Sequence, residues 1–206
     1  MAVKIFSSIL ILIGLAIILF LFGPVIKQEV DYTFNQLTGV RYSVDTTVAW
    51  SSQRPIYPPN TDFSIIIPKI NAVAPIVDNV DPSNSIQYLK ALKEGVAHAD
   101  GTAYPGEIGN MYLFAHSTDA FYNVGKYNAV FFLIGHLVPG DEIDVYYRGK
   151  LTKYVVYDKK IVDPEDTEFL GTLIEGEKTL TLQTCYPPGT TIKRLVVLAK
   201  LQESKQ

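Results

Sequence analysis

The chain has 206 residues, with 18 basic and 21 acidic side chains, 48% apolar residues and one cysteine. This balance fits a globular protein with a sizeable core and excludes a low-complexity or disordered chain. The net charge of −3 argues against a nucleic-acid-binding protein, which needs a basic face to neutralise phosphates. A single cysteine excludes an internal disulfide and any zinc site built on paired cysteines.

An uncharged apolar run extends over residues 5–26, between Lys4 and Lys27. At about 1.5 Å per residue, a helix of this length spans roughly 33 Å, enough for a hydrocarbon core of about 30 Å. A cleaved signal peptide would be shorter and would end in small residues, whereas this run ends in Gly-Pro-Val-Ile. We therefore predict a transmembrane anchor over residues 1–26. It would cross the plasma membrane once, with the domain that follows outside the cytoplasm.

Residues 27–62 are polar and irregular, and they predict a short helix followed by a stalk. From residue 63 to 206 the pattern changes to short β runs bounded by turn residues, which is typical of one domain. The predicted strands are 63–67, 72–77, 110–115, 142–147, 153–162, 178–185 and 192–201. Seven or eight strands favour a closed barrel. A helix is expected at 85–93, capped by Ser83 or Ser85, and a shorter one after Asp163.

Cys185 ends the predicted strand 178–185 and stands just before Pro187. Because side chains alternate along a strand, Leu182 and Thr184 face one side and Cys185 faces the other. If the leucine side is the core, the thiol points outward at a strand end, where catalytic groups often lie. Most free cysteines are small buried hydrophobes, however, so these features alone support a structural and a reactive thiol equally.

Three histidines are candidates for the base that a nucleophilic thiol needs. His116 follows an apolar strand and begins a polar loop, which suits a catalytic residue held by a rigid element. His136 lies just before the turn at Pro139, where a structural role is simpler, and His98 is intermediate. Spacing along the chain does not choose among them, because a thiol and its base meet in space.

Arg194 begins the last predicted strand, in which Leu195, Val197 and Ala199 form a purely apolar face. Arg194 is then expected on the opposite face, together with Val196 and Leu198. A guanidinium near a thiolate can stabilise negative charge that develops on a substrate carbonyl. An ordinary solvated arginine is the alternative and is favoured when this residue is taken alone.

These segments resemble the sortase family. Thr-Leu-Gln-Thr-Cys at 181–185, with Arg194 nine residues later, is similar to its cysteine and arginine segments. Pro-Gly-Glu-Ile-Gly-Asn at 105–110, leading to His116, is similar to its histidine segment. Pro-Gly-Asp at 139–141 matches a turn of the family. One departure is Ala115, because the family usually has glycine before its histidine; Gly135-His136 reproduces that pair at a position where the family has no catalytic residue.

The resemblance implies a closed eight-stranded β-barrel with one or two short helices. It also implies a cysteine transpeptidase that cuts a C-terminal Leu-Pro-x-Thr-Gly-like sorting signal between Thr and Gly. Cys185 would form a thioester, His116 would transfer protons and Arg194 would stabilise the oxyanion, while Thr184 would shape the substrate pocket. The partners would be surface proteins that carry such a signal and an amine acceptor on a peptidoglycan precursor or a pilin. No cofactor is implied.

The resemblance is closest to single-anchor sortases of class D or E, because residues 27–62 contain no Asp-Pro lid motif. The acidic residues Asp163, Glu165, Asp166 and Glu168 offer oxygens of the kind that calcium prefers, although a solvated acidic loop is the simpler interpretation. Two other functions stay open at this point. One is a membrane-tethered binding module that has lost turnover, and the other is a cysteine peptidase that releases its acyl-enzyme to water.

Overall fold

The computed structural model describes residues 2–44, 53–118, 127 and 129–203. Eight strands close into a barrel in the order β10-β8-β7-β3-β4-β5-β6-β9. Their bounds are β3 (Phe63–Ile67), β4 (Ala72–Val80), β5 (Val96–Ala99), β6 (Gly109–Phe114), β7 (Glu142–Tyr147), β8 (Lys150–Val162), β9 (Lys178–Tyr186) and β10 (Lys193–Leu201). The predicted closed eight-stranded barrel is therefore confirmed.

All seven predicted strands are present, and β5 is the barrel strand that the sequence pattern did not reveal. It has only four residues, Val-Ala-His-Ala, and all four are buried. β5 pairs in parallel with β4 and antiparallel with β6, so it completes the barrel between them. A strand of four residues that is buried on both faces shows no alternation of polar and apolar side chains, which is why the sequence pattern did not reveal it.

Helix α2 (Ser85–Glu94) connects β4 to β5, as such a parallel crossover requires, and confirms the predicted helix. Its N-cap is Asn84, whose side chain accepts a hydrogen bond from the backbone N–H of Gln87. The prediction of Ser83 or Ser85 as the cap was wrong. The Ser83 hydroxyl instead donates to Asp81, since a turn precedes the helix.

Three short 3₁₀ helices lie in the loops: η1 (Pro68–Ile70), η2 (Phe132–His136) and η3 (Glu168–Leu170). The last is the short helix expected after Asp163. The helix η3 also accounts for a wrong prediction. Val196 and Leu198 were expected on the outward face of β10 with Arg194, but both are buried. Lys160, the strand partner of Val196, lies over the ring of Phe169 in η3, so η3 covers this face of the sheet.

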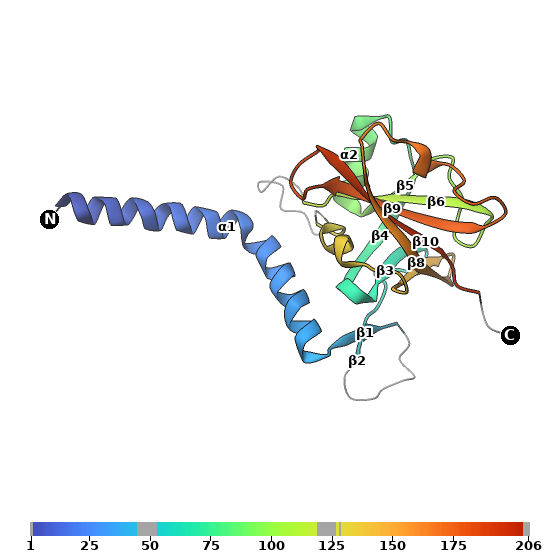
Figure 1. The fold of residues 1–206 in the computed structure, drawn as a ribbon, viewed down its shortest axis with the longest axis horizontal. Helices are drawn as coiled ribbons and strands as arrows, with labels where there is room; N and C mark the ends of the chain where they lie inside the picture. The colour runs from blue at the N-terminus through green and yellow to red at the C-terminus, as the bar shows by residue number, and fades with distance from the viewer. Residues whose placement is uncertain (1, 45–52, 119–126, 128, 204–206) are drawn as a thin grey trace.

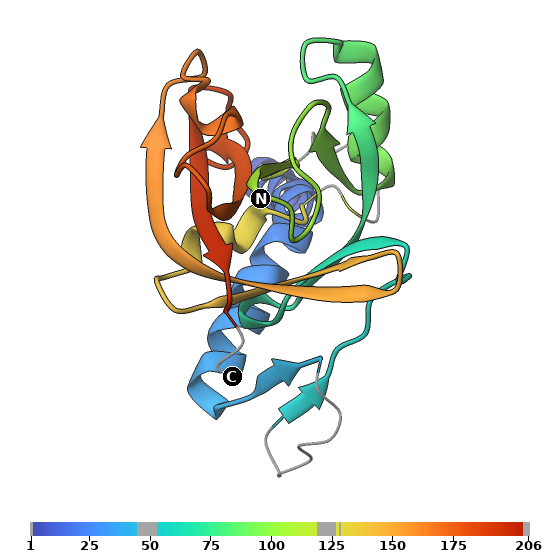
Figure 2. The same cartoon turned by 90° about the vertical axis from the view of Figure 1, so that its right-hand side faces the viewer.

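Helix α1 (Ala2–Thr38) precedes the barrel and bends part-way along, with its first half projecting away from the barrel (Figure 1). Gly23 and Pro24 lie in the middle of the helix, and a proline removes one backbone hydrogen bond there. After α1, strands β1 (Arg41–Ser43) and β2 (Gln53–Pro55) form a small parallel sheet of their own. Figure 2 shows this pair beside the barrel, not within it.

Within the residues that the structure describes, no helix combines the length and apolar character that a membrane span requires. The predicted anchor over residues 1–26 therefore stays a prediction. The predicted stalk over residues 27–62 contains the second half of α1 and the β1–β2 pair, and its residues 45–52 lie outside the described part of the chain.

Candidate active site

Cys185 is the next-to-last residue of β9, and its side chain is neither fully buried nor fully exposed. On the same strand Leu180 and Leu182 are inaccessible to solvent, and Thr184 is 3% exposed. The leucine side of β9 is thus the core, and Cys185 faces the other way, as the alternation predicts.

The neighbours of β9 bring both predicted partners of the thiol alongside it. In β10, Arg194 is paired with Cys185 directly across the antiparallel ladder, so the two side chains lie on the same face. In β6, Phe114 is paired with Gln183 in parallel, and the Ala115 N–H donates to the Gln183 carbonyl at 3.1 Å. Continuing this register by two residues aligns His116 with Cys185. The two strands that flank β9 therefore carry the arginine, paired with the cysteine, on one side and lead to the histidine on the other.

Ala115 replaces the family's usual glycine without disturbing this register. Its N–H is bonded to Gln183, and its carbonyl accepts a hydrogen bond from the Thr184 hydroxyl at 2.9 Å. Among the described residues that have positive φ, the non-glycine ones are Asn71, Asn79 and Arg148, so Ala115 is not held in a conformation that needs glycine.

A pocket of about 190 Å³ opens beside Cys185. Its lining includes Thr184 of β9, Leu195 of β10 and Phe132 of η2. Ser117, the residue that follows His116, lines it as well. The imidazole in the described lining of this pocket belongs to His136, and neither His116 nor Arg194 is part of that lining. The structure thus brings Cys185 and Thr184 into one pocket and pairs Arg194 with Cys185 across the sheet, while His116 lies two residues beyond the last paired residue of β6.

His136 connects the pocket to the second half of α1. Its Nε2 is 3.1 Å from the nearer carboxylate oxygen of Glu29, and its ring lies 4.4 Å from the ring of Tyr32, centroid to centroid. Glu29 also lines the pocket. A histidine that packs on an aromatic ring and pairs with a carboxylate holds α1 against η2, which is the structural role expected for it.

The comparison with protein families decides what kind of barrel this is. The sortase domain model matches residues 65–202, which is most of the chain. The chain belongs to the sortase family. It is 33% identical over 137 residues to Sortase D of Bacillus subtilis (strain 168), a match that covers 65% of this chain and 60% of that protein's length.

Solved sortases share the barrel. The lid mutant of sortase A from Corynebacterium diphtheriae superposes with a TM-score of 0.58 at 26% identity, covering 71% of this chain and 72% of that one. A Sortase D5 transpeptidase from Clostridium perfringens superposes with a TM-score of 0.57 at 29% identity, covering 72% and 82%. The similarity to class D proteins in both sequence and structure agrees with the class D or E resemblance. Sortases are cysteine transpeptidases, and Cys185 is the only cysteine of this chain.

In this sortase barrel, Arg194 is held by its own loop. Its Nη1 donates to the carbonyls of Thr191 at 3.1 Å and Lys193 at 3.2 Å. Tyr112 on β6 lies close enough for the guanidinium to act on it electrostatically, although burial dominates and raises the pKa of the Tyr112 hydroxyl far above its usual value. That hydroxyl donates to the side chain of Gln183, so it is committed to the protein and stays protonated at neutral pH.

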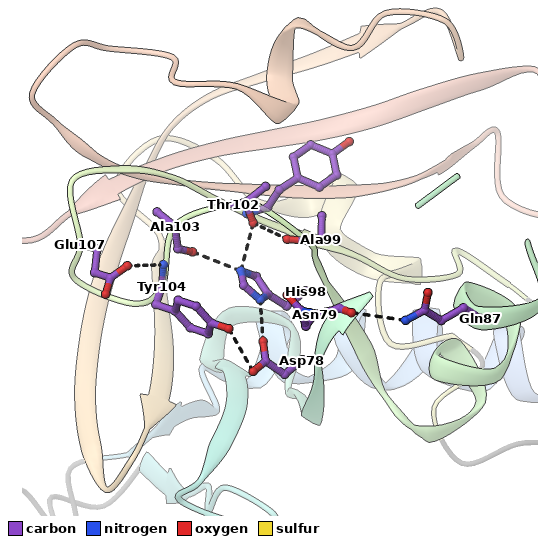
Figure 3. A network of polar contacts seen from close by, with 10 residues as sticks. Asp78, Asn79, Gln87, His98, Ala99, Thr102, Ala103, Tyr104 and Glu107 are labelled. Carbon is purple, nitrogen blue, oxygen red and sulfur yellow. Dashed lines mark hydrogen bonds and ion pairs between the residues drawn. The ribbon is translucent and has the colours of Figure 1, made fainter. Parts of the chain in front are cut away.

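His98 is not placed to act on Cys185. The ring is 1% exposed, with Nδ1 2.9 Å from Asp78 and Nε2 3.0 Å from the Thr102 hydroxyl and 3.2 Å from the Ala103 carbonyl (Figure 3). The Tyr104 hydroxyl donates to the other oxygen of Asp78 at 3.1 Å. Both ring nitrogens are therefore engaged in tying β4 and β5 to the following loop, which is a structural role.

Ser117 and Glu29 line the pocket but had not been singled out from the sequence. Ser117 directly follows His116, and only the chain-neighbour relation to a candidate base could have drawn attention to it. Glu29 is 107 residues from His136, and nothing in the sequence indicates that they meet.

The acidic loop that was weighed as a calcium site is spread over exposed positions. Asp163 forms an ion pair with Lys193, which uses part of its charge. Across the described ranges, no group of three or more His, Cys, Asp or Glu side chains is arranged to hold a metal ion.

Proposed function

We propose that this protein is a membrane-anchored sortase that cuts a Leu-Pro-x-Thr-Gly-like C-terminal signal between Thr and Gly and transfers the protein to an amine acceptor. The observation that carries the proposal is the position of the only cysteine. Cys185 lies at the end of β9, beside a pocket, and is paired with Arg194 on one side while His116 extends the register on the other.

The chemistry follows from these three groups. The Cys185 thiolate attacks the threonine carbonyl carbon, and its oxygen becomes an anion that the Arg194 guanidinium stabilises by charge-assisted hydrogen bonds. His116, as imidazolium, gives its proton to the glycine nitrogen as the C–N bond breaks, which leaves a thioester. The acceptor amine then attacks the thioester carbonyl, His116 takes its proton, and the sulfur departs as thiolate. Thr184 shapes the pocket wall with its hydroxyl turned to the Ala115 carbonyl.

The acceptor is proposed to be an amine on a peptidoglycan precursor or a pilin, and the clients are surface proteins that carry the signal. For the anchor, the support is the surface of the first half of α1, where large apolar side chains such as Phe6, Ile11 and Phe20 are exposed. Such a surface is unfavourable in water and favourable in a bilayer. We place the barrel outside the cytoplasm, anchored once in the plasma membrane.

The deciding experiment uses the full chain in detergent with a fluorogenic Leu-Pro-x-Thr-Gly peptide and a glycine-based amine. Wild type is expected to form a thioester on Cys185, detected by mass spectrometry, and to give ligated peptide when the amine is present. Cys185→Ala is expected to give neither. Cleavage without ligation at high amine concentration would instead indicate a peptidase. Absence of any thioester would indicate a binding module.

The anchor has its own test. The chain expressed in a bacterium is expected to sediment with membranes and to resist extraction at alkaline pH, with the barrel accessible to protease added outside the membrane. A chain lacking residues 2–26 is expected in the soluble fraction. Sedimentation of both with membranes would place the attachment elsewhere.

A further inference from the structure

Ser117 is the polar side chain of the Cys185 pocket whose hydrogen bonding is incomplete. It is 2% exposed, and its hydroxyl makes no hydrogen bond to any residue within the described ranges. Burying a hydroxyl without a partner costs about 1–3 kcal/mol, because the group loses its bonds to water and gains none. Because Ser117 lines a pocket, a ligand bound there is in a position to complete its hydrogen bonding.

The other buried hydroxyl in the pocket behaves differently. Thr184 is 3% exposed, and its hydroxyl donates to the Ala115 carbonyl at 2.9 Å, so its hydrogen is already used. Ser117 therefore has both a hydrogen to donate and lone pairs to accept with, whereas Thr184 can only accept.

The pocket around this hydroxyl is otherwise largely apolar on the side of Phe132, Leu195 and Pro188. An apolar wall with one buried hydroxyl that is still free to donate suits a small side chain that combines a methyl group with a hydroxyl group. Cys185 lines the same pocket, so the substrate residue bonded to its sulfur is the one expected to place its side chain against this wall.

We infer that Ser117 is a specificity-determining residue that hydrogen-bonds the side-chain hydroxyl of the substrate residue whose carbonyl Cys185 attacks. This inference rests on the proposed transpeptidase function and names the group that reads threonine in the signal. A site built to bond a hydroxyl rejects an analogue without it, because the buried partner is then left unpaired.

The test compares two peptides that differ only at this residue, threonine and its isostere valine, on the full chain in detergent. Wild type is expected to prefer threonine in kcat/KM by about 100-fold or more. Ser117→Ala is expected to lose about 10-fold or more on the threonine peptide and to change less than about 3-fold on the valine peptide, so that the preference collapses. Ser117→Thr, which keeps a hydroxyl, is expected to retain the preference.

The melting temperature distinguishes substrate recognition by Ser117 from a purely structural role. Ser117→Ala removes an unpaired buried hydroxyl, so its melting temperature is expected to equal or exceed that of wild type while its activity falls. Ser64→Ala on β3 is the matched control. Ser64 is fully buried, and its hydroxyl likewise has no partner among the described residues, but it is not part of the pocket lining. It is expected to behave as wild type on both peptides.

Three outcomes would overturn the inference. An equal loss on both peptides would assign Ser117 to the substrate backbone, and no loss on either would leave it outside substrate recognition. A loss of activity together with a lower melting temperature would indicate a structural role. If wild type cleaves neither peptide and forms no thioester, the proposed function itself is wrong. If wild type cleaves and Ser117→Ala cleaves equally well, only the role of Ser117 is wrong.

Discussion

Two polar clusters of this barrel differ in how completely their hydrogen bonds are satisfied. Around His98, both ring nitrogens and both oxygens of Asp78 have protein partners, and the histidine is sealed from solvent (Figure 3). Beside Cys185, a pocket is open and Ser117 has no hydrogen-bond partner among the described residues. A satisfied cluster contributes to folding, while an unsatisfied one next to a pocket is stabilised only when something binds.

The comparison explains why two histidines of one barrel have different consequences. His98 is expected to matter for stability and not for chemistry, and His116, two residues after the end of β6, for chemistry and not for stability. An exchange of these outcomes between the two histidines would contradict this assignment.

His116→Ala is expected to lower kcat/KM for peptide ligation by about 10³-fold, since proton transfer to the leaving amine loses its donor. Its melting temperature should stay within the error of wild type, because His116 lies beyond the end of β6. Steady-state kinetics and thermal denaturation measure the two.

His136→Ala is the matched control for this experiment, because that imidazole lines the pocket and pairs with Glu29 at 3.1 Å. It is expected to keep at least about a tenth of the wild-type activity, as an exposed pair contributes little. If His136→Ala abolished ligation and His116→Ala did not, the base would be His136.

Arg194→Ala is expected to lower kcat by about 10²-fold, the usual loss for one group that stabilises an oxyanion. Arg194→Lys should recover only part of this, because an ammonium cannot present the planar fork of a guanidinium. Arg148→Ala serves as the control, as that side chain lies over Tyr147 away from the pocket lining. A variant of Arg194 with full kcat would contradict the proposed role.

His98→Ala is expected to destabilise the barrel by about 3 kcal/mol, because Asp78 and the Ala103 carbonyl lose their partner at once. Tyr104→Phe removes one hydrogen bond at the edge of the same cluster and should cost about 1 kcal/mol. Chemical denaturation measures both. At a temperature where the variants are folded, their kcat is expected to match wild type, and a lower kcat would mean that the cluster also positions the active site.

Much of the fold was predictable because its signals are local. The strands at 63–67 and 142–147 match in both bounds, since both runs are rich in β-branched and aromatic residues and turn residues such as Pro68 and Gly140 bound them. The short buried β5 and the covered face at Val196 were not predictable. In both cases the deciding contact comes from a segment far along the chain, and a face covered by η3 looks exposed when the strand is read alone.

The candidate site was predictable from the sequence only for residues whose strands are neighbours along the chain. Cys185 and Arg194 flank one loop, so the sequence separation already suggests adjacent strands, and the structure pairs them. The parallel ladder between β6 and β9 ends at Phe114 and Gln183, two residues before His116 and Cys185, and no spacing along the chain reveals this pairing. Ser117 was missed because only the structure shows that its hydroxyl is buried without a hydrogen-bond partner among the described residues.

Tyr154 provides a further small predicted effect and a pH dependence with a definite sign. It is 1% exposed, and its hydroxyl accepts a hydrogen bond from the Gly106 N–H at 2.9 Å. Tyr154→Phe leaves that N–H unpaired and is expected to cost about 1 kcal/mol at neutral pH, measured by chemical denaturation.

Burial raises the pKa of Tyr154 from 10.0 to about 12, so at alkaline pH the unfolded chain releases the proton before the folded one does. The stabilisation is therefore fully present below pH 10 and is lost as the pH rises through about 12. In Tyr154→Phe this contribution is absent, so the difference in unfolding free energy between wild type and variant should shrink from pH 9 to pH 12. A difference that stays constant over this range would mean that the tyrosine ionises equally in both states.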